Sequence, residues 1–98
     1  MINKKSQQPD GLIELLLDKN AEFGDRDDAA MDLAGFDEVS VEAAFVTVVQ
    51  DMTEDDGIAD RAGESLAEIW KRKGAWDATL VDRMHPEAKK FFNGSSDN

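Results

Sequence analysis

The 98-residue chain has no cysteine, no tyrosine, one histidine and two prolines. Without cysteine it can form neither a disulfide framework nor a thiolate metal site. A single histidine leaves little material for acid–base catalysis, and no serine lies in a strand–turn–helix nucleophile motif. That histidine, His85, precedes Pro86 and is most simply a turn or capping residue. The sequence therefore indicates a protein that is not an enzyme.

Long apolar runs and glycine-rich phosphate loops are also absent. Residues 1–9 lack the apolar core of a signal peptide, so we expect a cytoplasmic protein. The acidic segment that begins at Asp18 starts like a calcium loop. However, Phe23 stands where that loop needs glycine, and Ala29 stands where it needs glutamate. No cofactor or metal ion is expected on this pattern.

Basic residues are scarce, with 11 Lys and Arg against 22 Asp and Glu, for a net charge of −11. Residues 18–60 hold fourteen acids and only two bases, Lys19 and Arg26. Between Lys71 and Lys90, in contrast, basic residues outnumber acidic ones. Such a field repels nucleic acid and anionic membranes, and it attracts a basic protein. A solvated surface would explain the same composition, so charge alone leaves recognition and solubility open.

Apolar residues recur at helical spacing through most of the chain. The strongest pattern predicts a helix over residues 53–73, with Ile58 and Leu66 on its buried face. Thr53 is the expected N-cap, and Gly74 is the expected left-handed stop. Gly63, in the interior of this helix, indicates a close contact with a neighbouring element.

Further helices are expected over residues 10–19, 25–34, 38–50, 77–83 and from 86 to 92. Asp37 is the expected N-cap of the helix over 38–50, and Met52 ends its inward face. No strand pattern is present. The predicted fold is all-α, with five to six short helices in antiparallel pairs. It forms one domain over residues 10–92, between a flexible N-terminus (1–9) and a disordered tail (93–98).

The sequence also matches itself when it is shifted by 33 residues. This shift superposes Asp18 on Asp51 and Leu33 on Leu66, without gaps, across two predicted helices and the turn between them. A period of this length, with two helices per unit, is typical of an α-solenoid, in which neighbouring helix pairs stack to bury their apolar faces.

The second unit resembles HEAT-type repeats. The resemblance lies in the small-residue helix from Ala62 to Ile69, the turn residues Asp51 and Asp55, and Arg61; the first unit carries Asp28 at the position of Arg61. It implies a HEAT-like α-solenoid fragment, a ladder of contacts between turn aspartates and arginine, and a role in protein–protein binding.

The whole chain, small, acidic and helical, is also similar to immunity proteins of bacterial toxin systems. That resemblance implies a basic partner, namely a cognate toxin of the nuclease type, whose active site is covered in a heterodimer. Two alternatives remain open. One is a HEAT-like adaptor in a larger complex, and the other is a small metal-dependent protein built on the acidic cluster.

Acidic residues gather at the starts of the helices over 25–34 and 53–73, which the repeat would bring side by side. They exceed what a helix dipole requires, so they predict an acidic ridge that binds a basic protein. A solubilising edge is the alternative. Trp70 is expected in the core, and Trp76 either in the core or at an interface. The predicted partner-binding residues are Asp25, Asp27, Asp28, Asp51, Glu54, Asp55, Asp56, Asp60, Glu64 and Trp76.

Overall fold

The computed structural model describes residues 9–93, which form six helices and no strand. The helices are α1 (Pro9–Leu17), α2 (Phe23–Leu33), α3 (Val39–Val49), α4 (Asp56–Lys73), α5 (Ala78–Asp82) and α6 (Pro86–Asn93). The predicted all-α class is confirmed for this part of the chain. The predicted flexible segment 1–9 and tail 93–98 lie outside it, except for Pro9 and Asn93, which belong to helices.

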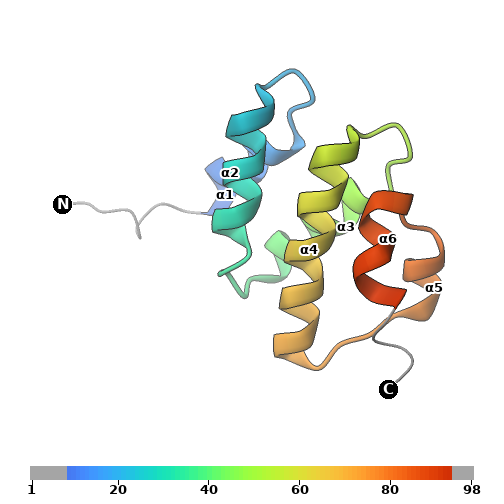
Figure 1. The fold of residues 1–98 in the computed structure, drawn as a ribbon. Helices are drawn as coiled ribbons and strands as arrows, with labels where there is room; N and C mark the ends of the chain where they lie inside the picture. The colour runs from blue at the N-terminus through green and yellow to red at the C-terminus, as the bar shows by residue number, and fades with distance from the viewer. Residues whose placement is uncertain (1–8, 94–98) are drawn as a thin grey trace.

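Figure 1 shows α1 and α2 at one end of the molecule, α3 and α4 in the middle, and α5 and α6 at the other end. α2, α4 and α6 lie side by side in one layer, and α1 and α3 pack together behind them. α4 is the central element, because it packs against α2, α3 and α6. The largest fully buried side chains come from every helix except α5: Leu16, Leu33, Val41, Phe45, Val49, Ile58, Leu66, Ile69 and Phe92.

The predicted buried face of α4 is confirmed. The small residues of this helix also allow α6 to approach it closely. Trp70 is 4% exposed, as expected for a core residue. On the side that faces α6, a Cβ atom added to Gly63 would lie only 2.5 Å from the Cα atom of Ala88. The expected close contact at Gly63 is therefore the packing of α4 on α6.

The start of α4 differs from the prediction, whereas its end agrees. Asp55 is the N-cap, because its carboxylate accepts hydrogen bonds from the N–H groups of Gly57 and Ile58 at 2.9 and 3.1 Å. The expected cap, Thr53, instead donates its N–H and hydroxyl groups to Asp51. Residues 51–53 therefore form a turn, and α4 begins only at Asp56. Gly74 has φ 70°, which is the predicted left-handed stop.

Two predictions about α3 are wrong. Asp37 does not cap it; the N-cap residue is Glu38, without a side-chain hydrogen bond, and Asp37 pairs with Arg72 at 2.8 Å. Met52 is 55% exposed, because α3 ends at Val49 and the helical spacing does not continue into the loop.

Candidate functional site

The starts of α2, α4 and α6 lie at one edge of the molecule, because these three helices run side by side in the same direction (Figure 1). Two ion pairs, each about one turn from a helix start, hold this arrangement. Arg61 Nε lies 2.8 Å from Asp27 Oδ1 and joins α4 to α2, and Lys90 Nζ lies 2.7 Å from Asp60 Oδ2 and joins α6 to α4. The edge therefore collects the positive ends of three helix dipoles.

The loops that precede α2 and α4 meet at the same edge. Asp51 accepts from Lys19 of the α1–α2 loop and from the N–H and hydroxyl groups of Thr53, the latter two at 2.9 and 2.6 Å. These contacts, that of Lys19 first, hold the pKa of Asp51 well below its ordinary value of 3.8. Asp18, 33 residues earlier, makes the same kind of turn by accepting from the N–H group of Asn20 at 2.9 Å.

A buried ion pair lies beneath this edge. Arg26 of α2 donates from Nη1 and Nη2 to the two carboxylate oxygens of Glu54 at 3.0 and 2.7 Å, and from Nε and Nη2 to the carbonyl oxygen of Leu16. Burial alone would raise the pKa of Glu54, but the hydrogen bonds from Arg26 and from the N–H group of Asp55 bring it below its ordinary value. The pair ties together the end of α1, the body of α2 and the α3–α4 loop.

Sequence reasoning missed this ion pair, although the helical spacing contains a signal for it. Arg26 precedes Ala29, Ala30 and Leu33 by three, four and seven residues. It therefore lies on the apolar face of α2, and those three neighbours are buried. A base on that face needs a buried acid as partner, but spacing does not reveal that the acid is Glu54, 28 positions away.

His85 is 5% exposed, and both ring nitrogens have backbone partners. Nδ1 accepts from the N–H group of Glu87 at 3.0 Å, so the ring proton is on Nε2, which donates to the carbonyl oxygen of Glu54 at 3.2 Å. Its own N–H group donates to the carbonyl oxygen of Val49 at 2.6 Å. The histidine therefore caps α6 and joins that helix to the α3–α4 loop, as the capping interpretation predicts.

The predicted acidic ridge is partly neutralised within the chain. Three of its acids form ion pairs: Asp27 with Arg61, Asp51 with Lys19, and Asp60 with Lys90. Glu64, another predicted binding residue, also pairs with Arg61. Glu54 is 6% exposed and faces Arg26, so it is not part of the surface.

The remaining acids near the helix starts are open to solvent. Asp25, Asp28 and Asp56 are exposed and form no ion pair with a lysine or arginine of residues 9–93. The side chain of Asp56 is 83% exposed and lies 3.5 Å from Nε2 of His85. Asp55 is also exposed while it caps α4. We call Asp25, Asp28, Asp55 and Asp56 the acidic edge.

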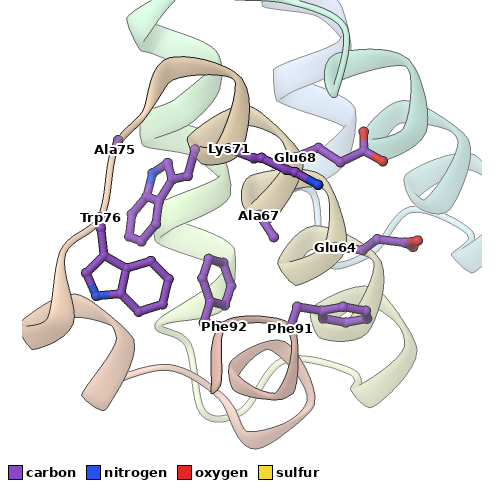
Figure 2. Close-up of a pocket in the computed structure, with 9 residues that line it drawn as sticks. Glu64, Ala67, Glu68, Lys71, Ala75, Trp76, Phe91 and Phe92 are labelled. Atoms are coloured by element: carbon purple, nitrogen blue, oxygen red, sulfur yellow. The ribbon is translucent and has the colours of Figure 1, made fainter. Parts of the chain in front are cut away.

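A groove of about 550 Å³ lies away from this edge, between the second half of α4, the α4–α5 loop and the end of α6. Figure 2 shows Trp76 at one end of it, Phe92 beside Ala67 in the middle, and Glu64 at the other end. Trp76 is 44% exposed and contacts Trp70 at a ring-centroid distance of 6.0 Å. Two predicted binding residues, Glu64 and Trp76, thus lie in this groove rather than on the acidic edge.

Within the described residues, no group of three or more histidine, aspartate and glutamate side chains is arranged to hold a metal ion. None of the helices between Pro9 and Asn93 has the length and apolar character that crossing a membrane requires. The ladder between turn aspartates and arginine that the HEAT resemblance implies is not found among residues 9–93, because Arg61 pairs with Asp27 of α2 and Asp51 pairs with Lys19.

Comparisons with protein-family models, with curated proteins and with solved structures find no match to this chain.

Proposed function

We propose that this protein is a protein-binding module, and specifically an immunity protein that neutralises a basic toxin domain of the nuclease type. The observation that carries the proposal is the acidic edge, where exposed acids remain after the ion pairs among residues 9–93 are counted. A helix start is neutralised by about half a unit of negative charge, and Asp55 and Asp56 together exceed this at α4. A partner that supplies lysine and arginine side chains would relieve their mutual repulsion.

The proposed mechanism is occlusion of the toxin's active site. A nuclease groove is rich in lysine and arginine because its substrate is a polyanion. The acidic edge would bind those side chains and keep the substrate out. The net charge of −11 would also steer the toxin toward the protein, so that association would slow as salt is added.

The finer fold assignment, a HEAT-like array of stacked helix pairs, belongs to this proposal. Two observations support it. α4 lies between α2 and α6 in one layer, and the turns at Asp18 and Asp51 have the same hydrogen-bond pattern 33 residues apart. Arrays of this kind present an edge of successive helix starts and loops, which suits the binding of an extended protein surface.

A second candidate function is an adaptor in a larger assembly, held by apolar contacts. It is favoured by exposed apolar side chains near the acidic edge. Phe23 is 53% exposed, and its ring lies against Gly57 at the start of α4. Met52, in the α3–α4 loop, is 55% exposed. Apolar association survives high salt, whereas binding through the acidic edge weakens.

The test is co-purification with the product of the adjacent upstream gene, as the candidate toxin, while salt is raised stepwise. The edge variant carries Asp25→Lys, Asp28→Lys and Asp56→Lys, all at exposed positions. We expect a one-to-one complex that weakens with salt, inhibition of toxin activity, and loss of both in the edge variant.

The matched control variant carries Glu14→Lys, Asp32→Lys and Asp82→Lys, which change the net charge equally at exposed positions elsewhere. It should retain binding. Equal loss in both variants, or a complex that persists in high salt, would argue for a general charge effect or for the adaptor function.

A further inference from the structure

Three aromatic rings pack against one another beside the groove next to α4. Trp70 contacts Phe92 and Trp76 in edge-to-face geometry, with centroid distances of 5.3 and 6.0 Å. Trp76 also contacts Phe92 at 6.0 Å. Trp70 is anchored because its Nε1–H group donates to Glu42 Oε2 at 2.8 Å. Trp70 and Phe92 are 4% and 1% exposed, so they support Trp76 from the core. The exposed face of Trp76 is therefore a preformed apolar surface, which a ligand need not order on binding.

Ala67 lies between the aromatic end and the acidic end, so that the groove runs without interruption along α4 (Figure 2). Trp76, although packed at its edges, leaves 44% of its surface exposed. An exposed tryptophan at the end of a hollow is a common anchor for a partner's side chain.

Charged side chains line the groove along α4. Glu64 and Glu68, one helical turn apart, lie at the end away from Trp76, and Lys71 lies between them and the tryptophan (Figure 2). Glu64 forms an ion pair with Arg61, which also pairs with Asp27; the Glu64 Oε1 atom lies 3.1 Å from Arg61 Nη1. Neither Glu68 nor Lys71 forms an ion pair with any of residues 9–93. The groove therefore combines the exposed face of Trp76 with the open carboxylate of Glu68.

We propose that this groove binds a segment of a protein partner in which an apolar side chain is followed by arginine. The apolar side chain would pack on Trp76, and the guanidinium group would reach Glu68. Arginine suits such a site because its stem is apolar, its planar head stacks on aromatic rings, and its donors match a carboxylate. The proposal rests on the proposed function in so far as both require a basic partner.

Charge selects this occupant over a second copy of the chain. Two copies would each carry −11 and would repel one another on approach. A basic segment instead gains attraction from the whole molecule and a specific contact at Glu68. Lys71 repels the bound arginine and so lowers the affinity. Removal of its charge should therefore strengthen binding, which is an effect specific to this site.

The test uses a synthetic peptide, acetyl-Leu-Arg-Ala-Leu-Arg-amide, as the probe. Two control peptides replace either both arginines by glutamate or both leucines by serine. Binding to the full chain is followed by tryptophan fluorescence and by amide chemical shifts at about 0.15 M salt, where the Debye length is about 8 Å. We expect the probe to shift amides of the second half of α4, the α4–α5 loop and α6, and both control peptides to bind more weakly.

Variants at the two kinds of lining residue should change the affinity in opposite directions. Glu68→Gln should weaken binding by about two- to fivefold, and Lys71→Gln should strengthen it by a similar factor. Trp76→Ala should weaken it by about tenfold or more, and Trp76→Phe should restore part of the loss. Because these positions are exposed or half-exposed, the fold is checked by circular dichroism and is expected to remain intact.

The inference fails if the glutamate peptide binds as well as the probe, if the shifts fall on the acidic edge, or if Glu68→Gln and Lys71→Gln act in the same direction. It is separable from the proposed function. If the toxin candidate binds the Trp76→Ala protein normally but not the edge variant, the groove assignment is lost and the proposed function stands. If the edge variant binds normally and the groove variants do not, the acidic-edge mechanism is lost instead.

Discussion

Arg26 is the only lysine or arginine buried among residues 9–93, and it binds two partners that lie on different segments. Its guanidinium group satisfies both oxygens of Glu54 and the carbonyl oxygen of Leu16. Since two charges have been removed from water, the pair contributes little net stability while it is complete. The removal of one partner, however, leaves a buried charge without compensation.

We therefore predict that Glu54→Gln lowers the free energy of unfolding by about 3–5 kcal/mol. The double variant Arg26→Met/Glu54→Leu should lose less than the single variant, because no charge remains buried. Urea unfolding followed by circular dichroism measures both. The control is Glu64→Gln, which breaks a half-exposed pair with Arg61 and should cost less than about 1 kcal/mol. Equal losses at positions 54 and 64 would contradict the assigned role.

Asp51 and Glu54 also predict how stability depends on pH. Their pKa values are lowered in the folded protein from 3.8 and 4.5, so the unfolded chain binds more protons in the acid range. The stabilisation is present above these ordinary values and is lost as the pH falls through the lowered ones. The free energy of unfolding should thus decrease as the pH falls below about 4.5.

The contribution of Glu54 can be separated by repeating the acid titration of stability on Glu54→Gln. Glutamine has no proton to bind, so the variant should show a shallower loss of unfolding free energy in this pH range. A variant that loses stability as steeply as the wild-type protein would show that other carboxylates cause the acid dependence.

At the scale of helices, the sequence predicted which face of a helix is buried more accurately than it predicted the residues at which the helix begins and ends. The spacing of Ile58, Ala62 and Leu66 identified the buried face of α4, because a helical period repeats over many residues. The start was misplaced because Thr53 and Asp55 are both suitable N-caps, and the choice depends on Asp51, which binds Thr53. Competition of this kind is decided by local hydrogen bonds that periodicity does not record.

The contact of α4 with α6 predicts an unusual response to alanine. Alanine normally stabilises a helix interior relative to glycine by about 0.5–1 kcal/mol. At position 63, however, the new Cβ atom would lie 2.5 Å from the Cα atom of Ala88, which is backbone and cannot rotate away. Gly63→Ala should therefore destabilise the protein by about 1–3 kcal/mol.

Gly11→Ala is the matched control for Gly63→Ala, because Gly11 lies in α1 and nothing approaches its added Cβ atom within 4 Å. It should raise the melting temperature while Gly63→Ala lowers it. Tryptophan fluorescence should also change in Gly63→Ala, since a displaced α6 moves Phe92 away from Trp70. A stabilised Gly63→Ala variant would mean that α6 is not held against α4.

At the scale of the whole molecule, the sequence predicted where acids gather but not which of them are already neutralised. Asp27 and Asp28 are neighbours of the same type, yet Asp27 pairs with Arg61 and Asp28 has no such partner among residues 9–93. The pairing residue lies 34 positions away. Such distances along the chain carry no periodic signal, so the candidate site required the fold to be known.

The two neighbours provide a direct measure of the molecule's self-repulsion. Asp27→Asn and Asp28→Asn change the net charge of −11 by the same single unit. Asp28→Asn only reduces repulsion and should stabilise the protein by a few tenths of a kcal/mol, an effect that shrinks as salt shortens the Debye length. Asp27→Asn also breaks the contact between α2 and α4, so it should destabilise by up to about 1 kcal/mol. Urea unfolding at low and high salt measures both. If the two variants shift stability in the same direction at low salt, net charge dominates and the ion pair between the helices contributes nothing.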